Sequence, residues 1–262
     1  MHAVIEKVQL GSYTLAYSRS ATEIGETCLL LLHGLQSRKE VFADLRAHLD
    51  QVLPLPHLAV DFLGFGESDK PEDFTYALNA QLDVLSMLLR RLGIRRVHVI
   101  GHSRGGMTGT LLLDSAPEMV GSLISLEGNL CYEDCGESKK VAALDFHTFR
   151  SQYYPELKAK LANSNEPSAH FRLESLDLIP DYAFYRTSCT TVSIAHSGSL
   201  LESYRRSHRP KLMICGMNSP FRSRIQGEQM SLVEIPNAGH FMLADNPEAV
   251  KDAVSSFLCR HV

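Results

Sequence analysis

The chain has 262 residues, 44% of them apolar and 21% charged, which is typical of one large globular domain or of a core domain with an insertion. Its formal net charge of −4 argues against a nucleic-acid partner, because a polyanion requires a basic surface. No stretch approaches the roughly 20 apolar residues of a membrane span, and residues 1–11 lack the apolar core of a signal peptide, so we expect a cytoplasmic protein without a membrane span.

Strands and helices alternate along the first half of the chain. Two segments separated by Gly11, residues 2–10 and 12–18, predict an opening β-hairpin. Apolar runs predict further strands over residues 28–32, 57–61, 97–101 and 122–126. Helical periodicity predicts helices over about residues 40–50, 77–92 and 104–115. This alternation predicts an α/β fold, with a mostly parallel sheet flanked by helices.

The alternation stops after Glu127. From there to about residue 209 the sequence shows amphipathic helical segments, such as residues 141–149 and 157–161, interrupted by prolines. Alternation then resumes, with strands predicted over residues 211–215 and 231–235 and helices over residues 221–226 and 247–259. We therefore divide the chain into a core, residues 1–129 and 210–262, and an inserted helical lid, residues 130–209. The lid is rich in Phe and Tyr, which suits an apolar acyl group but equally suits helix packing.

The strand over residues 97–101 runs directly into Gly101-His102-Ser103-Arg104-Gly105, and a helical pattern follows. A Gly-x-Ser-x-Gly sequence between a strand and a helix is typical of a nucleophile elbow, a turn so sharp that only glycine fits two residues to either side of the serine. The turn predicts that the Ser103 hydroxyl is presented at the top of the sheet. A serine in front of a helix also serves as an ordinary N-cap, which is the alternative.

Three further motifs accompany this elbow. His33-Gly34-Leu35 ends one strand, an Asp-x-x-Gly-x-Gly-x-Ser loop begins at Asp61, and Ala238-Gly239-His240 follows the last strand. With these motifs in this order, the chain resembles the α/β-hydrolase superfamily over nearly its whole length. The resemblance implies that Ser103 is a nucleophile and that the backbone N–H groups of Leu35 and Arg104 form an oxyanion hole. We expect the Asp61 loop to shape the fold, and the Arg104 side chain to form a salt bridge at the start of its helix.

His240 is the predicted general base, because it lies late in the chain in a loop after a strand. In most relatives the acid that orients the base follows the strand over residues 211–215, but here Asn218 stands at that position and cannot carry a charge. Glu127 ends the neighbouring predicted strand, and adjacent strand ends are only about 5 Å apart. We therefore assign Glu127 as the acid, with Asp134 and Asp145 of the lid as the alternatives.

The sequence thus predicts a serine hydrolase that cleaves an ester or related acyl bond of a small-molecule substrate through a covalent acyl-enzyme, with no metal or organic cofactor. The same residues suit a thioesterase, amidase, lactonase or carbon–carbon bond hydrolase. A ligand-sensing receptor with slow or vestigial chemistry is an alternative of a different class, favoured by the missing acid at Asn218. An inactive structural homologue is the third alternative, and the presence of both Ser103 and His240 argues against it. A serine nucleophile excludes the dehalogenase branch of the family, which uses aspartate.

Overall fold

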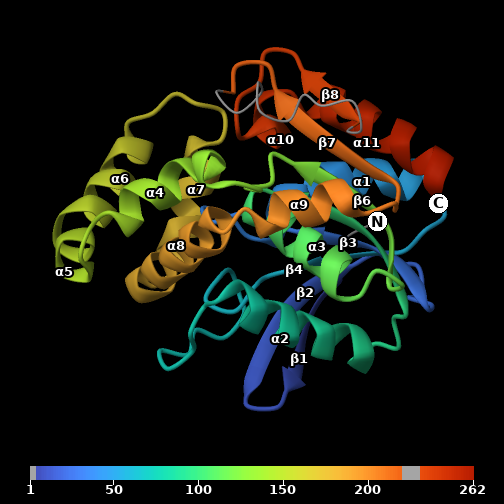
Figure 1. Ribbon diagram of the computed structural model, residues 1–262, viewed down its shortest axis with the longest axis horizontal. Coiled ribbons are helices and arrows are strands. Elements are labelled where there is room, and N and C mark those ends of the chain that lie inside the picture. Colours follow the sequence, from blue (N-terminus) through green and yellow to red (C-terminus); the bar gives the residue numbers. More distant parts are fainter. Residues whose placement is uncertain (1–3, 220–230) are drawn as a thin grey trace.

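A single eight-stranded sheet forms the centre of the computed structural model, which describes residues 4–219 and 231–262 (Figure 1). Its strand order is β1-β2-β4-β3-β5-β6-β7-β8. Two pairs of strands are antiparallel: β1 (Val4–Leu10) with β2 (Tyr13–Arg19), and β2 with β4 (His57–Val60). All other pairs are parallel and involve β3 (Thr27–Leu32), β5 (Arg96–His102), β6 (Val120–Leu126), β7 (Lys211–Gly216) and β8 (Leu232–Ile235). The predicted α/β fold with a mostly parallel sheet is confirmed.

The sheet is covered on both faces, which explains why its strands are continuous apolar runs. Leu29 and Leu31 of β3 pack in one core cluster with side chains of α1 (Ala43–Val52) and α11 (Pro247–His261). Leu30 and Leu32 point to the opposite face and pack in a second cluster with side chains of α2 (Leu78–Arg91) and α3 (Arg104–Ser115). The register holds the carboxyl ends of the central strands level, because Leu32 pairs with Gly101 and His102 with Leu126. Residues that follow these strands therefore meet at one edge of the sheet.

The elements between β6 and β7 are all helical, as predicted. They are a short 3₁₀ turn (Tyr132–Asp134), α4 (Gly136–Ala142), α5 (Phe146–Thr148), a π-helical turn (Phe149–Tyr153), α6 (Tyr154–Ala162), α7 (Ala169–Asp177), α8 (Asp181–His196) and α9 (Ser199–Arg206). Figure 1 shows α4 to α8 grouped at one end of the sheet, whereas α9 lies over α3. That this region acts as a lid remains a prediction.

The prediction of one helix over residues 141–149 is wrong. α4 ends at Ala142, and α5 begins after Asp145, whose carboxylate accepts hydrogen bonds from the backbone N–H and the hydroxyl of Thr148. An aspartate that caps a new helix in this way competes with continuation of the preceding one. Nearby, the ring of Phe149 contacts those of Tyr154 and Phe184, so aromatic side chains of this region pack on one another.

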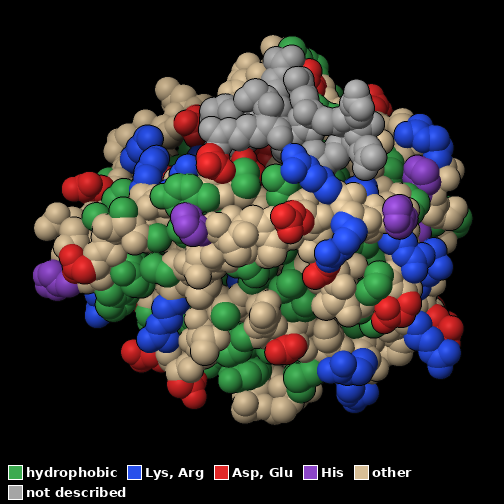
Figure 2. Space-filling model, viewed as in Figure 1, with side chains coloured by type: hydrophobic (Ala, Val, Ile, Leu, Met, Phe, Trp, Pro, Cys, Tyr) green, Lys and Arg blue, Asp and Glu red, His purple; other side chains and the backbone are tan. Residues whose placement is uncertain are grey.

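Other differences from the expected elements are small. A 3₁₀ turn (Lys39–Phe42) precedes α1 within the predicted helix, and the short α10 (Met242–Asp245) was not predicted. The predicted helix over residues 221–226 lies outside the described residues. On the face seen in Figure 2, acidic and basic side chains are interspersed. None of the helices in residues 4–219 and 231–262 combines the length and the apolar character that crossing a bilayer requires.

Candidate active site

The predicted elbow is present between β5 and α3. Ser103 stands between these two elements with φ 53° and ψ −120°, a strained conformation for a residue with a side chain. A β-carbon on Gly101 would overlap the backbone of Gly105, and one on Gly105 would overlap the carbonyl of Leu32. The backbone N–H of Ser103 donates to Leu126 O of the next strand at 2.8 Å. The two glycines therefore permit a turn that this neighbouring strand holds in place.

Glu127 and His240 meet beside this turn. Glu127 follows β6 directly, and His240 lies in the loop after β8. His240 Nδ1 lies 2.7 Å from Glu127 Oε2, so the contact that the sequence predicted is present. A neutral imidazole that donates a hydrogen bond from Nδ1 carries its proton there, so the lone pair that a general base needs is on Nε2.

Glu127 is held as a buried carboxylate. Its side chain is 2% exposed, and its φ of 47° lies in the left-handed region. Burial opposes its ionisation, but hydrogen bonding and attraction to His240, the N–H of Gly216 and the Ser219 side chain together hold its pKa below the ordinary value. The end of β7 and the loop after it thus supply hydrogen-bond donors to Glu127.

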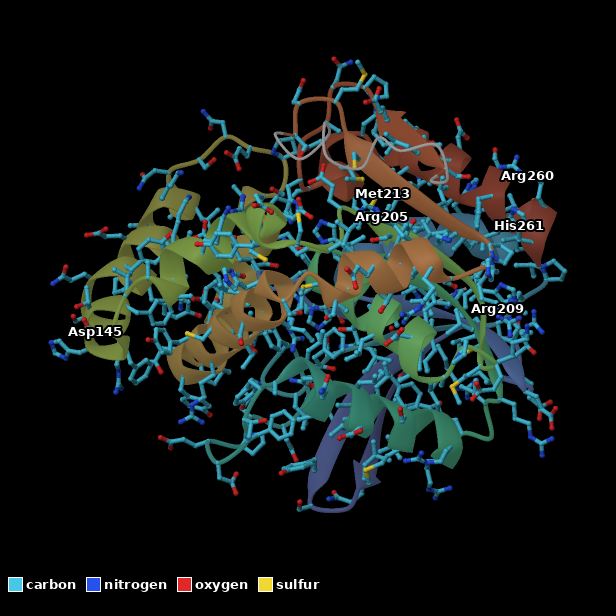
Figure 3. All side chains as sticks on the ribbon, in the orientation of Figure 1. Asp145, Arg205, Arg209, Met213, Arg260 and His261 are labelled. Atoms are coloured by element: carbon cyan, nitrogen blue, oxygen red, sulfur yellow. The ribbon has the colours of Figure 1, made fainter. Side chains whose placement is uncertain are left out.

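Asn218 and the two alternative acids, Asp134 and Asp145, have different surroundings. Asn218 is exposed, and its backbone N–H donates to Ala238 O. Asp145 caps α5 at the outer end of the helical region, far from β7 (Figure 3). Asp134 Oδ2 accepts hydrogen bonds from the backbone N–H and the thiol of Cys131. Glu127 is therefore the better candidate for orienting His240.

Leu35 and Arg104, whose N–H groups are the predicted oxyanion donors, flank Ser103. Arg104 is the first residue of α3, where a backbone N–H has no intrahelical acceptor. The loop that contains Leu35 approaches Ser103 closely, since a β-carbon on Gly34 would lie 3.1 Å from Ser103 Cβ. This arrangement is compatible with an oxyanion hole, whose assignment remains a prediction.

The expected salt bridge of the Arg104 side chain is wrong. The guanidinium is buried, with its carbon 5.1 Å from the centre of the Phe62 ring and one N–H 3.5 Å from Tyr76 O. No carboxylate of the described residues pairs with it, and two of its nitrogens have no hydrogen-bond partner there. Burial lowers its pKa to about 10, which still leaves it charged at neutral pH. The first turn of α3 lies inside the core, where the guanidinium of Arg104 packs against the ring of Phe62.

Asp61 is also fully buried. It accepts hydrogen bonds from the backbone N–H groups of Lys39 and Glu67, and it forms an ion pair of 2.9 Å with Lys39 Nζ. These contacts tie the loop after β4 to the residues that follow β3, which is compatible with a role in shaping the fold.

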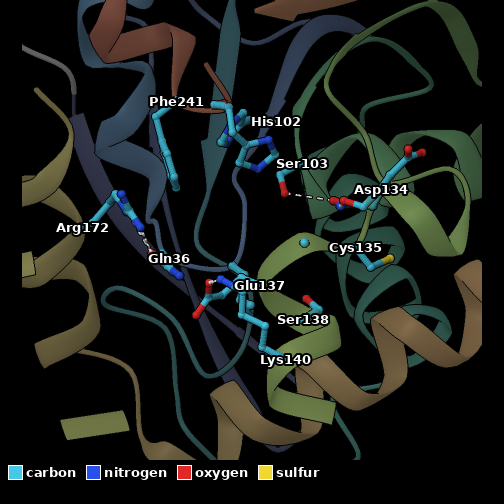
Figure 4. A pocket seen from close by; sticks show the side chains of 14 residues that line it. Gln36, His102, Ser103, Asp134, Cys135, Glu137, Ser138, Lys140, Arg172 and Phe241 are labelled. Carbon is cyan, nitrogen blue, oxygen red and sulfur yellow. Dashed lines mark hydrogen bonds and ion pairs between the residues drawn. The ribbon is translucent and has the colours of Figure 1, made fainter. Parts of the chain in front are cut away.

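A cavity of about 240 Å³ opens in front of Ser103 (Figure 4). Its lining includes Ser103, His240 and Leu35, together with polar or charged side chains of the helical region such as Ser138 and Lys140. None of the aromatic residues between positions 146 and 185 lines it. The arrangement brings a hydroxyl and an imidazole to the wall of a small cavity, with a carboxylate behind the imidazole, which is suited to acyl transfer.

His102, the residue before the candidate nucleophile, supports the loop of the candidate base. Its Nε2 donates a hydrogen bond to the backbone carbonyl of His240 at 2.8 Å, and the two rings lie 5.0 Å apart. Burial, and the nearby charge of His240 when protonated, lower the pKa of His102 to about 3, so it is neutral. Sequence reasoning assigned it no role, although it is the first x of the Gly-x-Ser-x-Gly motif.

Arg172 of α7 contacts both loops that flank the candidate nucleophile. Its Nε and Nη2 donate to Gln36 Oε1, next to Leu35, at 2.9 and 2.7 Å (Figure 4). Its guanidinium carbon lies 4.1 Å from the centre of the Phe241 ring, next to His240. No signal in the sequence indicated these contacts, because residues 130–209 carry no motif.

Comparisons with known proteins agree with this architecture. Residues 29–253 match the model of the alpha/beta hydrolase family. The chain is 25% identical to a 2-(acetamidomethylene)succinate hydrolase of Mesorhizobium japonicum, over 98% of this chain and 96% of that one. It is 26% identical to an sn-1-specific diacylglycerol lipase of Mus musculus, over 97% and 88%. Among solved structures, a carboxylesterase of Nitrososphaera gargenis superimposes with a TM-score of 0.80 at 18% identity, covering 98% of each chain.

Proposed function

Because the chain belongs to the alpha/beta hydrolase family and is an enzyme of the hydrolase class, we propose that it is a serine hydrolase. Ser103 is the nucleophile, His240 is the general base and Glu127 orients the base. The enzyme cleaves an ester or a related acyl bond through a covalent acyl-enzyme, and residues 130–209 form its lid.

One observation carries this proposal: the 2.7 Å contact between His240 Nδ1 and Glu127 Oε2 beside the strained turn at Ser103. A buried carboxylate stabilises the imidazolium that forms when a base takes the nucleophile's proton. The receptor alternative drew its support from the missing acid at Asn218. Glu127 is a carboxylate in contact with His240, which removes that support, so catalysis is favoured.

The chemistry follows from these positions. His240 Nε2 accepts the proton of the Ser103 hydroxyl while the oxygen attacks the acyl carbon. The N–H groups of Leu35 and Arg104 stabilise the oxyanion. His240 then donates its proton to the leaving group, and a water molecule repeats the sequence to release the acid. The His240 side chain is 28% exposed, which leaves it accessible from the cavity.

The size of the cavity favours a small substrate. Its volume of about 240 Å³ lies below the roughly 300–1,000 Å³ of sites for drug-sized ligands. Polar and charged side chains such as Ser138, Lys140 and Arg172 contribute to its wall. A short acyl group therefore suits this cavity better than a long alkyl chain does.

Fluorophosphonate labelling tests the nucleophile. The folded protein should take up one label, and peptide mass spectrometry should locate it at Ser103. p-Nitrophenyl acetate should be hydrolysed repeatedly, and Ser103→Ala should lose on the order of 10³-fold or more in kcat. A label at another residue, the absence of a label on folded protein, or a single turnover would contradict the proposal.

A further inference from the structure

Asn129 contacts the candidate nucleophile directly, although no catalytic role has been assigned to it. Ser103 Oγ donates a hydrogen bond to Asn129 Oδ1 at 3.0 Å, marked by the dashed line at Ser103 in Figure 4. Asn129 is 7% exposed and lines the cavity. It lies two residues after Glu127, on the loop that leaves β6. A buried amide therefore stands beside the oxygen that is proposed to react.

The orientation of this amide is determined by its other contact. Asn129 Nδ2 donates to the backbone carbonyl of Asp134, which can only accept a hydrogen bond. The NH₂ group must therefore face Asp134, and Oδ1 must face Ser103. The position beside the nucleophile is consequently that of a hydrogen-bond acceptor.

The proposed reaction removes the donor that this acceptor now has. A hydroxyl carries one proton, so the Ser103 hydroxyl must turn from Asn129 to His240 before the base can take its proton. After the attack, Oγ is bonded to the acyl carbon and can no longer donate. Oδ1 would then be a buried acceptor facing another oxygen, an arrangement that costs free energy unless a new donor arrives.

The substrate is well placed to supply that donor. Atoms three bonds from Oγ in the tetrahedral intermediate, such as the oxygen of a 2-hydroxyl group, come within reach of an acceptor that lies 3.0 Å from Oγ. We propose that Asn129 Oδ1 is a specificity subsite, which accepts a hydrogen bond from an N–H or O–H group adjacent to the scissile carbonyl. The preferred substrates are then small acyl compounds with such a donor, for example 2-hydroxy or 2-amido acyl groups. This inference rests on the proposed role of Ser103.

A pair of esters that differ in one group tests the subsite. p-Nitrophenyl 2-hydroxypropanoate carries the donor, and p-nitrophenyl 2-methylpropanoate has a methyl group in its place. kcat/KM is measured for both esters with the wild type, with Asn129→Leu, which lacks the acceptor, and with Asn129→Asp, which keeps one. Asn163→Leu makes the same change at an exposed position of the helical region and serves as the control.

The wild type should prefer the hydroxy ester by about 10- to 100-fold beyond the ratio of the two uncatalysed rates, the range expected when a buried acceptor is left without a donor. Asn129→Leu should abolish this preference, whereas Asn129→Asp and Asn163→Leu should retain it. Comparing ratios cancels the intrinsic reactivity of the esters and any uniform loss of active protein.

Fluorophosphonate labelling of each variant separates the two possible failures. If Ser103 is labelled but the wild type shows no preference for the hydroxy ester, or Asn129→Leu lowers kcat/KM equally for both esters, the subsite is refuted while the serine hydrolase stands. If Ser103 is not labelled in the folded wild type, the proposed function itself is refuted.

Discussion

Replacing Glu127 by glutamine tests the proposed catalytic arrangement most sharply. The two side chains have nearly the same shape, so the substitution removes the charge while keeping the volume. We expect Glu127→Gln to fold and to lose about 10²- to 10⁴-fold in kcat, by analogy with the loss of the acid in other triads.

The magnitude follows from two of the hydrogen bonds that the carboxylate accepts. Oε2 accepts from His240 and Oε1 from the N–H of Gly216, at 2.7 and 2.9 Å. Glutamine has only one acceptor oxygen. If that oxygen faces Gly216, its NH₂ group donates to His240 Nδ1 and moves the imidazole proton to Nε2, where the base must accept one. If it faces His240, two N–H groups oppose each other at Gly216, and the charge that stabilises the imidazolium is lost in either case.

The expected loss corresponds to about 3–5 kcal/mol of transition-state stabilisation. The assay is kcat and KM for p-nitrophenyl acetate, with circular dichroism and thermal unfolding to establish that the variant is folded. Asn218→Ala, a change at the exposed residue where the resemblance to the family places the acid, is the matched control and should cost far less. A folded Glu127→Gln enzyme that loses less than tenfold, or an Asn218→Ala enzyme that loses as much, would refute the assignment of the acid.

Three other expectations follow from the same contacts. Gly105→Ala should prevent folding or lower the melting temperature steeply, since its β-carbon would overlap the carbonyl of Leu32; an unchanged melting curve would contradict the packing of the turn. Burial lowers the pKa of His33 and of His102 to about 3, so below about pH 6.5 the unfolded chain binds more protons than the folded one. These two residues should therefore lower the free energy of unfolding, measured in urea, by about 4 kcal/mol when the pH falls from 8 to 5. An equal free energy of unfolding at both pH values would be inconsistent with buried neutral rings. Arg172→Met should lower kcat about tenfold with a smaller change in KM, because it removes the contacts that hold both loops beside the nucleophile. Arg172→Lys should not restore kcat, because lysine lacks the planar guanidinium that donates two hydrogen bonds to Gln36. A change confined to KM would assign Arg172 to substrate binding instead.

Much of the fold follows from local sequence signals. Strands such as residues 28–32 and 97–101 are apolar runs because the sheet is covered on both faces, and that pattern is complete within each segment. The turn at Ser103 is likewise encoded locally, by the two glycines that make it sterically possible. The contact between Glu127 and His240 was also predictable, because Glu127 follows β6, the strand that pairs with β7, and the resemblance places the acid directly after β7.

Only the tertiary structure decided the surroundings of the site. The hydrogen bond from His102 to the backbone of His240 joins residues 138 positions apart, and that between Arg172 and Gln36 joins residues 136 apart. The buried guanidinium of Arg104 and the acceptor at Asn129 likewise depend on side chains from several elements packing together. A sequence pattern reports which face of a helix or strand is apolar, but it does not report which distant side chain will lie opposite a polar group. That partner is chosen when the helical region packs against the ends of the strands, because each buried polar atom must then find a donor or acceptor within about 3 Å.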